Sequence, residues 1–138
     1  MTELEDLVGK QKRVVSISNH VTVRDAAKAM AEANVGAAAI MDGTKLVGLF
    51  TERDVLKRVL LRNLDVDEVL VRDVMTRDLI CAELGHNTND ARFLLKRHHI
   101  RHLPVLDKEG NLAGVLSIRD LIKDEVREMR DYIAQAEG

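Results

Sequence analysis

The sequence of 138 residues is poor in aromatic side chains and cysteine, and it lacks long apolar runs. Three aromatics, Phe50, Phe93 and Tyr132, are too few for single-stranded nucleic-acid binding by base stacking. One cysteine excludes an intrachain disulfide and a cysteine-based zinc site, which favours a reducing compartment. No run approaches the roughly 18 apolar residues of a membrane helix, and the N-terminus lacks an apolar signal core. A net charge of −2 disfavours electrostatic capture of nucleic acid. We therefore expect a cytoplasmic globular protein.

The sequence does contain an internal repeat. Asp25 and Ala26 match Asp90 and Ala91, which lie 65 positions later, and a one-residue insertion then makes the offset 66. Seven aligned pairs are identical: Asp25/Asp90, Ala26/Ala91, Asp42/Asp107, Leu46/Leu112, Gly48/Gly114, Arg53/Arg119 and Asp54/Asp120. Because the matches are collinear with a single gap, the chain consists of two copies of one structural unit.

Each copy has the apolar periodicity of a β-α-β-β-α unit. Strands are predicted at residues 14–17, 37–41 and 46–50, and at 79–82, 103–106 and 112–116. Predicted helices follow the N-caps Thr22, Thr88 or Asn87, Thr51 and Ser117. The expected fold is α/β (α+β), with two repeats packed in pseudo-two-fold symmetry around a shared core, since neither copy has enough strands for a core alone. The predicted boundaries are 8–62 for the first repeat, 63–76 for a linker, 77–125 for the second repeat and 126–138 for a C-terminal helix extension.

In each copy, a hydroxyl residue at the end of the last strand is followed three positions later by an aspartate. The pairs are Thr51 with Asp54 and Ser117 with Asp120. One interpretation is a helix cap, in which the hydroxyl and the carboxylate bind backbone amides reciprocally. The other is a nucleotide site, in which the helix N-terminus binds phosphate and the carboxylate accepts hydrogen bonds from both ribose hydroxyls. The two interpretations are compatible, and the residues alone leave both open.

Together these segments resemble a known family. The repeated unit, residues 48–54 and 114–120, the lead-in at 73–76 and the segment 101–105 resemble tandem cystathionine β-synthase (CBS) domains, or Bateman modules. The resemblance covers roughly residues 8–125. It implies a regulatory pair that binds adenine nucleotides or adenosyl ligands in clefts between the copies and forms homodimers. Such pairs are usually attached to an enzyme or channel, whereas this chain resembles a stand-alone pair.

The resemblance also implies a role for particular residues, with Asp54 and Asp120 on the ribose and Thr51 and Ser117 on phosphate. The expected site of the second repeat comprises Asp120, Ser117, Arg101, His102, Val35, Val14, Val115, Lys12 and Arg13. The expected site of the first repeat comprises Asp54, Thr51, Ile100, Ile80 or Leu79, Leu49, Met75 and Thr76. In both, aliphatic side chains of the two copies hold the adenine, because the sequence offers no aromatic platform.

The largest chemical difference between the copies lies at Arg101 and His102, which correspond to Gly36 and Ala37. They are interpreted either as a solvated strand end or as a cationic lip for phosphates, for which arginine is well suited. On the second interpretation, the Asp120 site binds an anionic ligand better than the Asp54 site.

Other motifs favour structural roles. His98, His99 and His102 lack the spacing of a metal site, so no metal is expected. Cys81 is interpreted as a small buried filler, because no catalytic base or nucleophile signature flanks it. Gly48 and Gly114 either ease a bulge or, by the resemblance, keep the last strand clear beside a ligand.

The predicted function is therefore a regulatory, non-catalytic sensor of energy state that binds AMP, ADP, ATP or another adenosyl ligand. It would signal to an unknown target enzyme or transporter by a conformational change, without a membrane and without nucleic acid. The alternative is a nucleic-acid-binding or protein-interaction module that uses the charged C-terminal helix. Alternating acidic and basic residues on that helix favour a solvated or dimer-forming face over DNA.

Overall fold

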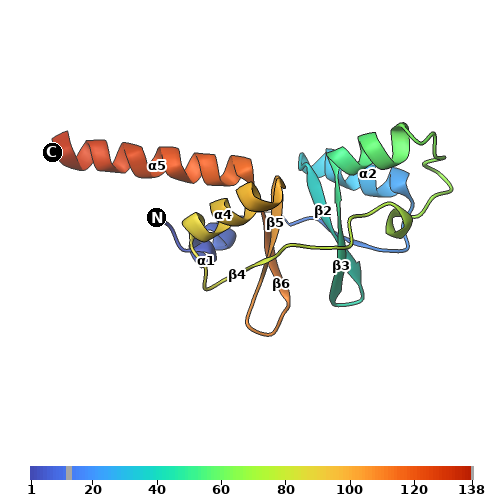
Figure 1. Ribbon diagram of the computed structural model, residues 1–138, viewed down its shortest axis with the longest axis horizontal. Coiled ribbons are helices and arrows are strands. Elements are labelled where there is room, and N and C mark those ends of the chain that lie inside the picture. Colours follow the sequence, from blue (N-terminus) through green and yellow to red (C-terminus); the bar gives the residue numbers. More distant parts are fainter. Residues whose placement is uncertain (12–13, 138) are drawn as a thin grey trace. The chain divides into compact units, whose positions relative to one another are not determined.

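The computed structural model describes residues 1–11 and 14–137, which form two compact units. The first repeat lies in the unit Lys12–Leu79, whereas the second combines Met1–Gln11 with Ile80–Gly138. The N-terminal residues therefore belong with the second repeat, and the segment that follows the first repeat, residues 63–76, belongs with the first. Figure 1 shows the chain path through each unit.

The unit of the first repeat is built on a three-stranded sheet of order β1-β2-β3. Strand β1 pairs parallel with β2, and β2 pairs antiparallel with β3. Its elements are β1 (Ser16–Ser18), α2 (Val23–Ala33), β2 (Ala37–Asp42), β3 (Lys45–Thr51), α3 (Glu52–Asp54), the π-helical segment η1 (Val55–Leu60) and the 3-10 turn η2 (Val71–Asp73).

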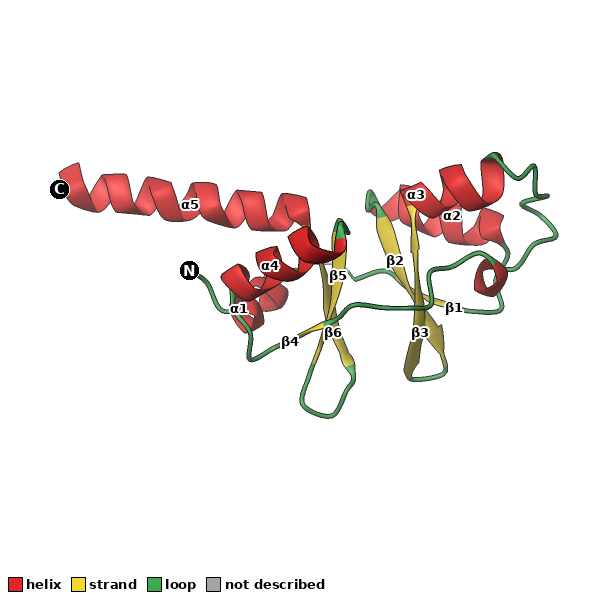
Figure 2. Ribbon diagram, viewed as in Figure 1, coloured by secondary structure: helices red, strands yellow, loops and turns green. Residues whose placement is uncertain are grey.

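The unit of the second repeat has the same arrangement, in the order β4-β5-β6. Its elements are α1 (Leu4–Gly9), β4 (Ala82–Glu83), α4 (Thr88–His98), β5 (His102–Leu106), β6 (Leu112–Ser117) and α5 (Ile118–Glu137). Figure 2 shows a helix between the first and second strands and another after the third strand in both units. The predicted β-α-β-β-α repeat is thus confirmed.

The hairpin strands lie within one residue of their predicted bounds, but the first strand of each repeat begins later than expected. Strand β1 starts at Ser16 and β4 at Ala82, where pairing with Ala39 and Val105 begins. The sequence analysis assigned the apolar residues before Ser16 and Ala82 to these strands. A strand, however, comprises only the residues that pair in register with a neighbouring strand, and this pairing begins at Ser16 and Ala82.

The helix that links the first two strands has matching ends in both repeats. Thr22 caps α2 by accepting from the Asp25 amide, and Asn87, rather than Thr88, caps α4 in a reciprocal capping box with Asp90. Both helices end at a residue with left-handed backbone, Asn34 (φ 55°) and His99 (φ 53°). A single left-handed residue is a common way to end a helix.

Each unit buries a cluster of its own, and the expectation of a core shared between the repeats stays a prediction. In the first-repeat unit, Val71, Val74 and Met75, from the segment after the repeat, complete the cluster around α2 and the sheet. In the other unit, Leu4 of α1 is fully buried among residues of α4, α5 and the sheet. A segment from outside each repeat therefore supplies the apolar surface that the short strands lack.

Candidate ligand-binding sites

The carboxylate of the first repeat, Asp54, lies in the first turn of α3 and is only 6% exposed. Its Oδ2 accepts from the Thr51 amide at 3.0 Å and from the Thr51 hydroxyl at 3.1 Å. The Asp54 amide donates to the Thr51 hydroxyl at 3.2 Å, which completes a capping box. The capping interpretation of this pair is therefore confirmed.

Two further side chains engage the same carboxylate. The Thr76 hydroxyl lies 3.2 Å from Oδ1 and 3.3 Å from Oδ2 of Asp54. Arg58, one helical turn after Asp54, places its Nε 3.5 Å from Oδ1 and donates to the Met75 carbonyl at 3.0 Å. Both carboxylate oxygens of Asp54 thus have partners within the unit.

The segment that carries Thr76 runs along the last strand of the first repeat. Leu49 and Thr76 exchange both backbone hydrogen bonds, each 2.9 Å long. Leu49 and Met75 are buried beside them. The structure therefore brings together five of the site residues predicted within this unit, Asp54, Thr51, Leu49, Met75 and Thr76.

The two repeat-related glycines allow this close approach. A Cβ on Gly48 would lie 2.4 Å from Sδ of Met75 and 3.0 Å from the Thr76 carbonyl oxygen. A Cβ on Gly114 would lie 2.6 Å from Oε1 of Gln11 and 2.9 Å from Cγ1 of Val8. Each glycine also stands next to a register shift in its hairpin, which agrees with the interpretation that it eases a bulge.

The carboxylate of the second repeat, Asp120, is half-buried in the first turn of α5. Its Oδ2 accepts from the Ser117 amide at 2.8 Å, and its own amide donates to the Ser117 hydroxyl at 3.2 Å. Among the described residues, this Ser117 amide is the one donor bonded to the Asp120 carboxylate. A helix cap is therefore present here too, but the carboxylate keeps accepting capacity.

Two basic residues stand beside this cap. The register of β5 and β6 sets His102 directly opposite Ser117. The carbonyl of Arg101 accepts from the Ile118 amide at 3.0 Å, and its side chain is exposed. The backbone thus sets Arg101 and His102 beside Ser117 at the N-terminus of α5, whereas the first repeat has Ala37 opposite Thr51.

The repeat offsets identify the source of the difference between the two carboxylates. Arg58 corresponds to Asp124 at an offset of 66, and Thr76 corresponds to Gln11 at an offset of 65. The side chain of Gln11 donates to the Val115 carbonyl at 2.7 Å. Arg58 is a site residue that the sequence analysis missed, although its i,i+4 spacing from Asp54 is a recognised ion-pair signal.

The remaining predicted residues divide between the two units. Val115 is half-buried in β6 of the Asp120 unit. Val14 and Val35, which were predicted for the Asp120 site, lie in the first-repeat unit, and Val14 is 37% exposed. Ile80 and Ile100, which were predicted for the Asp54 site, lie in the second-repeat unit. Val35 packs against the core cluster of its own unit, and Ile80 and Ile100 pack against the other. Lys12 and Arg13 lie outside the described residues. Because the aliphatic residues predicted to hold the adenine belong to both units, that part of each site stays a prediction.

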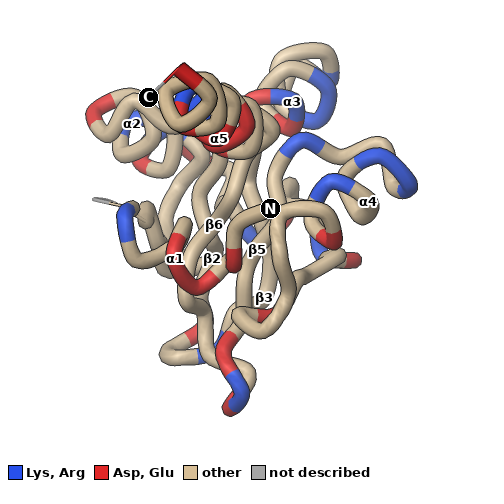
Figure 3. Tube along the Cα trace, turned by 90° about the vertical axis from the view of Figure 1, so that its left-hand side faces the viewer, with Lys and Arg blue, Asp and Glu red and all other residues tan. Residues whose placement is uncertain are grey.

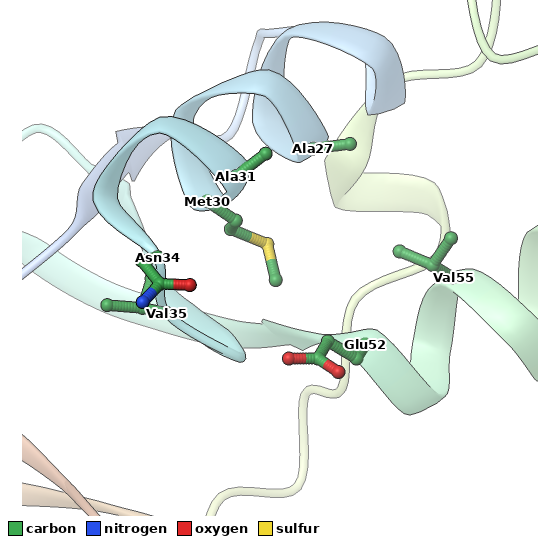
Figure 4. Close-up of a pocket in the computed structure, with 7 residues that line it drawn as sticks. All are labelled: Ala27, Met30, Ala31, Asn34, Val35, Glu52 and Val55. Atoms are coloured by element: carbon green, nitrogen blue, oxygen red, sulfur yellow. The ribbon is translucent and has the colours of Figure 1, made fainter.

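A pocket of about 320 Å³ lies within the first-repeat unit, between α2 and the start of α3 (Figure 4). It is lined by Ala27, Met30, Ala31, Asn34, Val35, Glu52 and Val55. Of the predicted site residues it contains Val35 alone. The pocket is mainly aliphatic and is distinct from the Asp54 carboxylate.

The cysteine and histidine motifs take structural positions. Cys81 is half-buried just before β4, and burial raises the pKa of its thiol, which lowers its reactivity. His98 and His99 end α4. Within residues 1–11 and 14–137, no group of three His, Cys, Asp or Glu is arranged to hold a metal ion, and no helix is long and apolar enough to cross a membrane.

Two repeats of this topology, each with a capped aspartate after its last strand, define a CBS domain pair. The chain belongs to the CBS domain family, whose model matches residues 4–61 and 71–127. It is 30% identical to the CBS domain-containing protein YhcV of Bacillus subtilis over 126 residues, which is 91% of this chain and 87% of that protein.

Solved structures support the same assignment. A crystal structure of a CBS domain has 37% identity and a TM-score of 0.85, and the match covers 91% of this chain and 99% of that one. A CBS domain protein of Pyrobaculum aerophilum complexed with AMP has 30% identity and a TM-score of 0.78, with 87% and 89% covered. Some relatives are longer, since the chain spans 66% of a protein of Acidianus ambivalens and 22% of the inosine-5'-monophosphate dehydrogenase of Methanocaldococcus jannaschii.

Proposed function

We propose that this CBS pair is a regulatory, non-catalytic module that binds an adenine nucleotide, with the stronger site at Asp120. The observation that carries the proposal is the contrast between the two carboxylates. Asp120 is half-buried and accepts one hydrogen bond from the Ser117 amide, whereas Asp54 is 6% exposed and engaged by Thr51, Thr76 and Arg58. The AMP complex of the 30% identical relative supports the choice of ligand class.

The chemistry of the Asp120 site suits a ribose with a phosphate tail. A carboxylate with free accepting capacity can receive both vicinal hydroxyls of a ribose in charge-assisted hydrogen bonds. The 20-residue helix α5 directs the positive end of its dipole toward the same place. Arg101, whose carbonyl accepts from the Ile118 amide, adds a positive charge for the phosphate near this end of the helix.

Binding at Asp54 must first displace an internal partner. The Thr76 hydroxyl and the Arg58 guanidinium occupy both oxygens that a ribose would use. A ligand at this site therefore loses part of its binding free energy to the broken contacts, and we expect weaker affinity there.

The test is isothermal titration calorimetry with AMP on the wild type, Asp120→Ala and Asp54→Ala, with inorganic phosphate as the ligand control. We expect Asp120→Ala to abolish the tighter binding event and Asp54→Ala to leave it. Equal losses in both variants would contradict the asymmetry. Absence of any heat with AMP, ADP, ATP or S-adenosylmethionine would contradict the sensor itself.

For such a module to signal, the ligand must bind two conformations with unequal affinity, because tight binding to both shifts no equilibrium. We propose that the partner that receives the signal is a target enzyme or transporter, and that the module acts as a homodimer.

A further inference from the structure

The pocket between α2 and the start of α3 has the size and the lining of a small-molecule site. Its volume of about 320 Å³ lies at the lower end of the roughly 300–1,000 Å³ of such sites, which are mainly apolar with a few polar groups. Met30, only 4% exposed, supplies apolar surface, whereas Asn34 and Glu52 are exposed and polar. In Figure 4 the Glu52 carboxylate lies opposite the end of the Met30 side chain. The pocket therefore suits a ligand with an aliphatic part and a polar end.

The second repeat indicates which kind of group belongs at this position. Ala27 and Ala31, which line the pocket, correspond at the offset of 65 to Arg92 and Lys96 of α4. Arginine and lysine both have a long aliphatic stem with a cationic head. Arg92 lies close enough to α5 for its charge to contribute to the lowered pKa of Asp124. The first repeat thus has methyl groups where the second has two cationic chains, and this difference leaves the space open.

The end of α2 at the pocket lacks a cation of its own. The last turn of α2 contains no basic residue, whereas the last turn of α4 contains Lys96, Arg97 and His98. Figure 3 shows the Lys and Arg positions of α4 in blue. Cations stabilise the C-terminal end of a helix, because the backbone carbonyls there carry partial negative charge. Asn34, the C-cap of α2, lines the pocket, so a bound cation would complement this end of the helix.

Glu52 adds a full negative charge at the same place. It stands where the second repeat has Ile118, at the offset of 66, and it is the one charged residue among the seven that line the pocket. Within the part of the chain that the structure describes, no group forms a hydrogen bond or an ion pair with its carboxylate. The neighbouring Lys28, Glu32 and Arg53 are exposed and do not line the pocket. The Glu52 carboxylate is therefore available to a cationic ligand.

We propose that the pocket binds a small aliphatic primary amine in its ammonium form. The carbon chain of the amine packs against Met30 and Val55, and its N–H donors meet the Glu52 carboxylate and the carbonyl end of α2. Because the ligand takes the place of a lysine stem, which has four carbons, a chain of about four or five carbons fits. The lining residues include neither Asp54 nor Asp120, so the proposal goes beyond nucleotide binding and does not rest on it.

A chemical-shift titration at constant ionic strength tests the class of ligand. The probes are pentylammonium, pentan-1-ol and pentanoate, which share one carbon chain and differ in the charge of the head group. We expect saturable amide shifts at Ala31, Asn34 and Glu52 with pentylammonium and none with pentanoate. Pentan-1-ol should bind about two- to fivefold more weakly, which is the range of an exposed ion pair. No saturation with pentylammonium, or equal affinity for the alcohol, would overturn the proposal.

Glu52→Gln tests the carboxylate, since this variant should bind pentylammonium about two- to fivefold more weakly than the wild type. Glu32→Gln removes the same charge from an exposed position outside the pocket, and this matched control should bind like the wild type. Equal affinities of Glu52→Gln and the wild type contradict the proposal. Nα-acetyl-lysine amide carries the same ammonium on a peptide backbone. Tighter binding of this probe than of pentylammonium would overturn a free amine as the ligand and indicate a lysine of a protein partner.

Ala31→Lys restores the side chain that the second repeat carries. Its own ammonium should occupy the pocket and abolish the binding of pentylammonium, whereas Ala31→Ser leaves the space open and should bind like the wild type. The dispersion of the amide spectrum shows whether each variant is folded. Asp54→Ala/Asp120→Ala should keep the amine site. Loss of amine binding in this double variant would place the amine at the capped aspartates, and undiminished binding in Ala31→Lys would place it outside the pocket. Either result refutes the proposal.

Discussion

Asp54 and Asp120 share the reciprocal backbone contacts of a helix cap, and the residue one turn later contributes to the difference in how free each carboxylate is. Arg58 pairs with Asp54, and the corresponding Asp124 turns instead to Arg127, at 2.8 Å. Because an ion pair competes with a ligand hydroxyl for the same oxygen, Arg58 lowers the capacity of the Asp54 carboxylate to accept hydrogen bonds from a ligand.

Arg58→Ala, made in an Asp120→Ala background, should raise the AMP affinity of the remaining site about two- to fivefold, which is the range of a partly exposed ion pair. The reason is that Oδ1 of Asp54 is released from the guanidinium. Calorimetry measures the change, and Lys57→Ala on the same helical segment is the control. Weaker binding after Arg58→Ala would instead mean that Arg58 contacts the ligand phosphate.

Replacing Gly48 or Gly114 by alanine, which adds only a methyl group, should lower the stability of the protein. A Cβ would lie 2.4 Å from Met75 Sδ or 2.9 Å from Val8 Cγ1, so the neighbours must shift. We expect Gly48→Ala and Gly114→Ala each to lower the free energy of unfolding by about 1–3 kcal/mol, measured by urea denaturation. Gly85→Ala, where no atom lies within 4 Å of the added Cβ, is the control. A neutral Gly48→Ala would show that Met75 moves aside without loss.

Asp124 should make stability depend on pH. Burial alone raises the pKa of its carboxyl, but the hydrogen bonds of Arg127 and Thr2, together with the charges of Arg127 and Arg92, outweigh burial and hold the pKa below the ordinary 3.8. The folded state therefore favours the ionised form. This contribution is complete above the unfolded pKa and disappears as the pH falls through the folded pKa.

Asp124→Asn should accordingly lower the free energy of unfolding by about 1–3 kcal/mol at pH 7, the range for a hydrogen bond to a charged group. The gap from the wild type should shrink below about pH 4. Urea denaturation at pH 7, 5 and 3 measures it. Asp131→Asn, whose partner Arg127 lies 3.4 Å away at an exposed position, should change little at any pH. A gap that persists at pH 3 would contradict the ion-pair explanation.

At the scale of elements, α1 depends on its docking site. Six residues are far too few for an isolated helix to be stable in water. Its order comes from Leu4, which is fully buried, and from the Leu4 amide, which donates to the His86 carbonyl at 3.0 Å. An N-terminal segment that lies outside the repeat thereby becomes part of the second-repeat core.

Leu4→Ala should therefore lower the free energy of unfolding by about 2–5 kcal/mol, the range for a buried leucine. Thermal or urea unfolding measures the loss, and hydrogen exchange should locate it in the second-repeat unit. Leu61→Ala, at a position 69% exposed, should change stability by less than about 0.5 kcal/mol. If Leu4→Ala behaves like Leu61→Ala, α1 is not part of the core.

At the scale of the whole molecule, the two repeats share a topology but present different chemistry after the last strand. A ligand that binds only the folded state stabilises it by about 2.7 kcal/mol at 100 times its dissociation constant. AMP should therefore raise the melting temperature of the wild type by several degrees. The Asp54→Ala/Asp120→Ala variant should show no shift, and inorganic phosphate is the ligand control. An undiminished shift in the double variant would locate the nucleotide elsewhere.

Local patterns in the sequence were sufficient to predict the repeat, the order of strands and helices, and the two hydroxyl–aspartate pairs. Periodicity reports which face of an element is buried, and a cap is made by residues three apart, as in Thr51 with Asp54. Both kinds of signal lie within a few neighbouring positions. The i,i+4 pair of Asp54 and Arg58 was equally local and could have been read.

Only the tertiary structure decided which segments complete each unit. Leu4 lies with the repeat that begins some 80 residues later, and Met75 and Thr76 fold back onto the strand that contains Gly48 and Leu49. Such contacts are set by the fit of apolar surface and by hydrogen bonds between distant positions, which no periodicity encodes. They also decided that the two carboxylates are unequal, which neither the scarcity of aromatic residues nor the near balance of charge indicates. Asp54 is engaged within its unit, whereas Asp120 has capacity for a ligand.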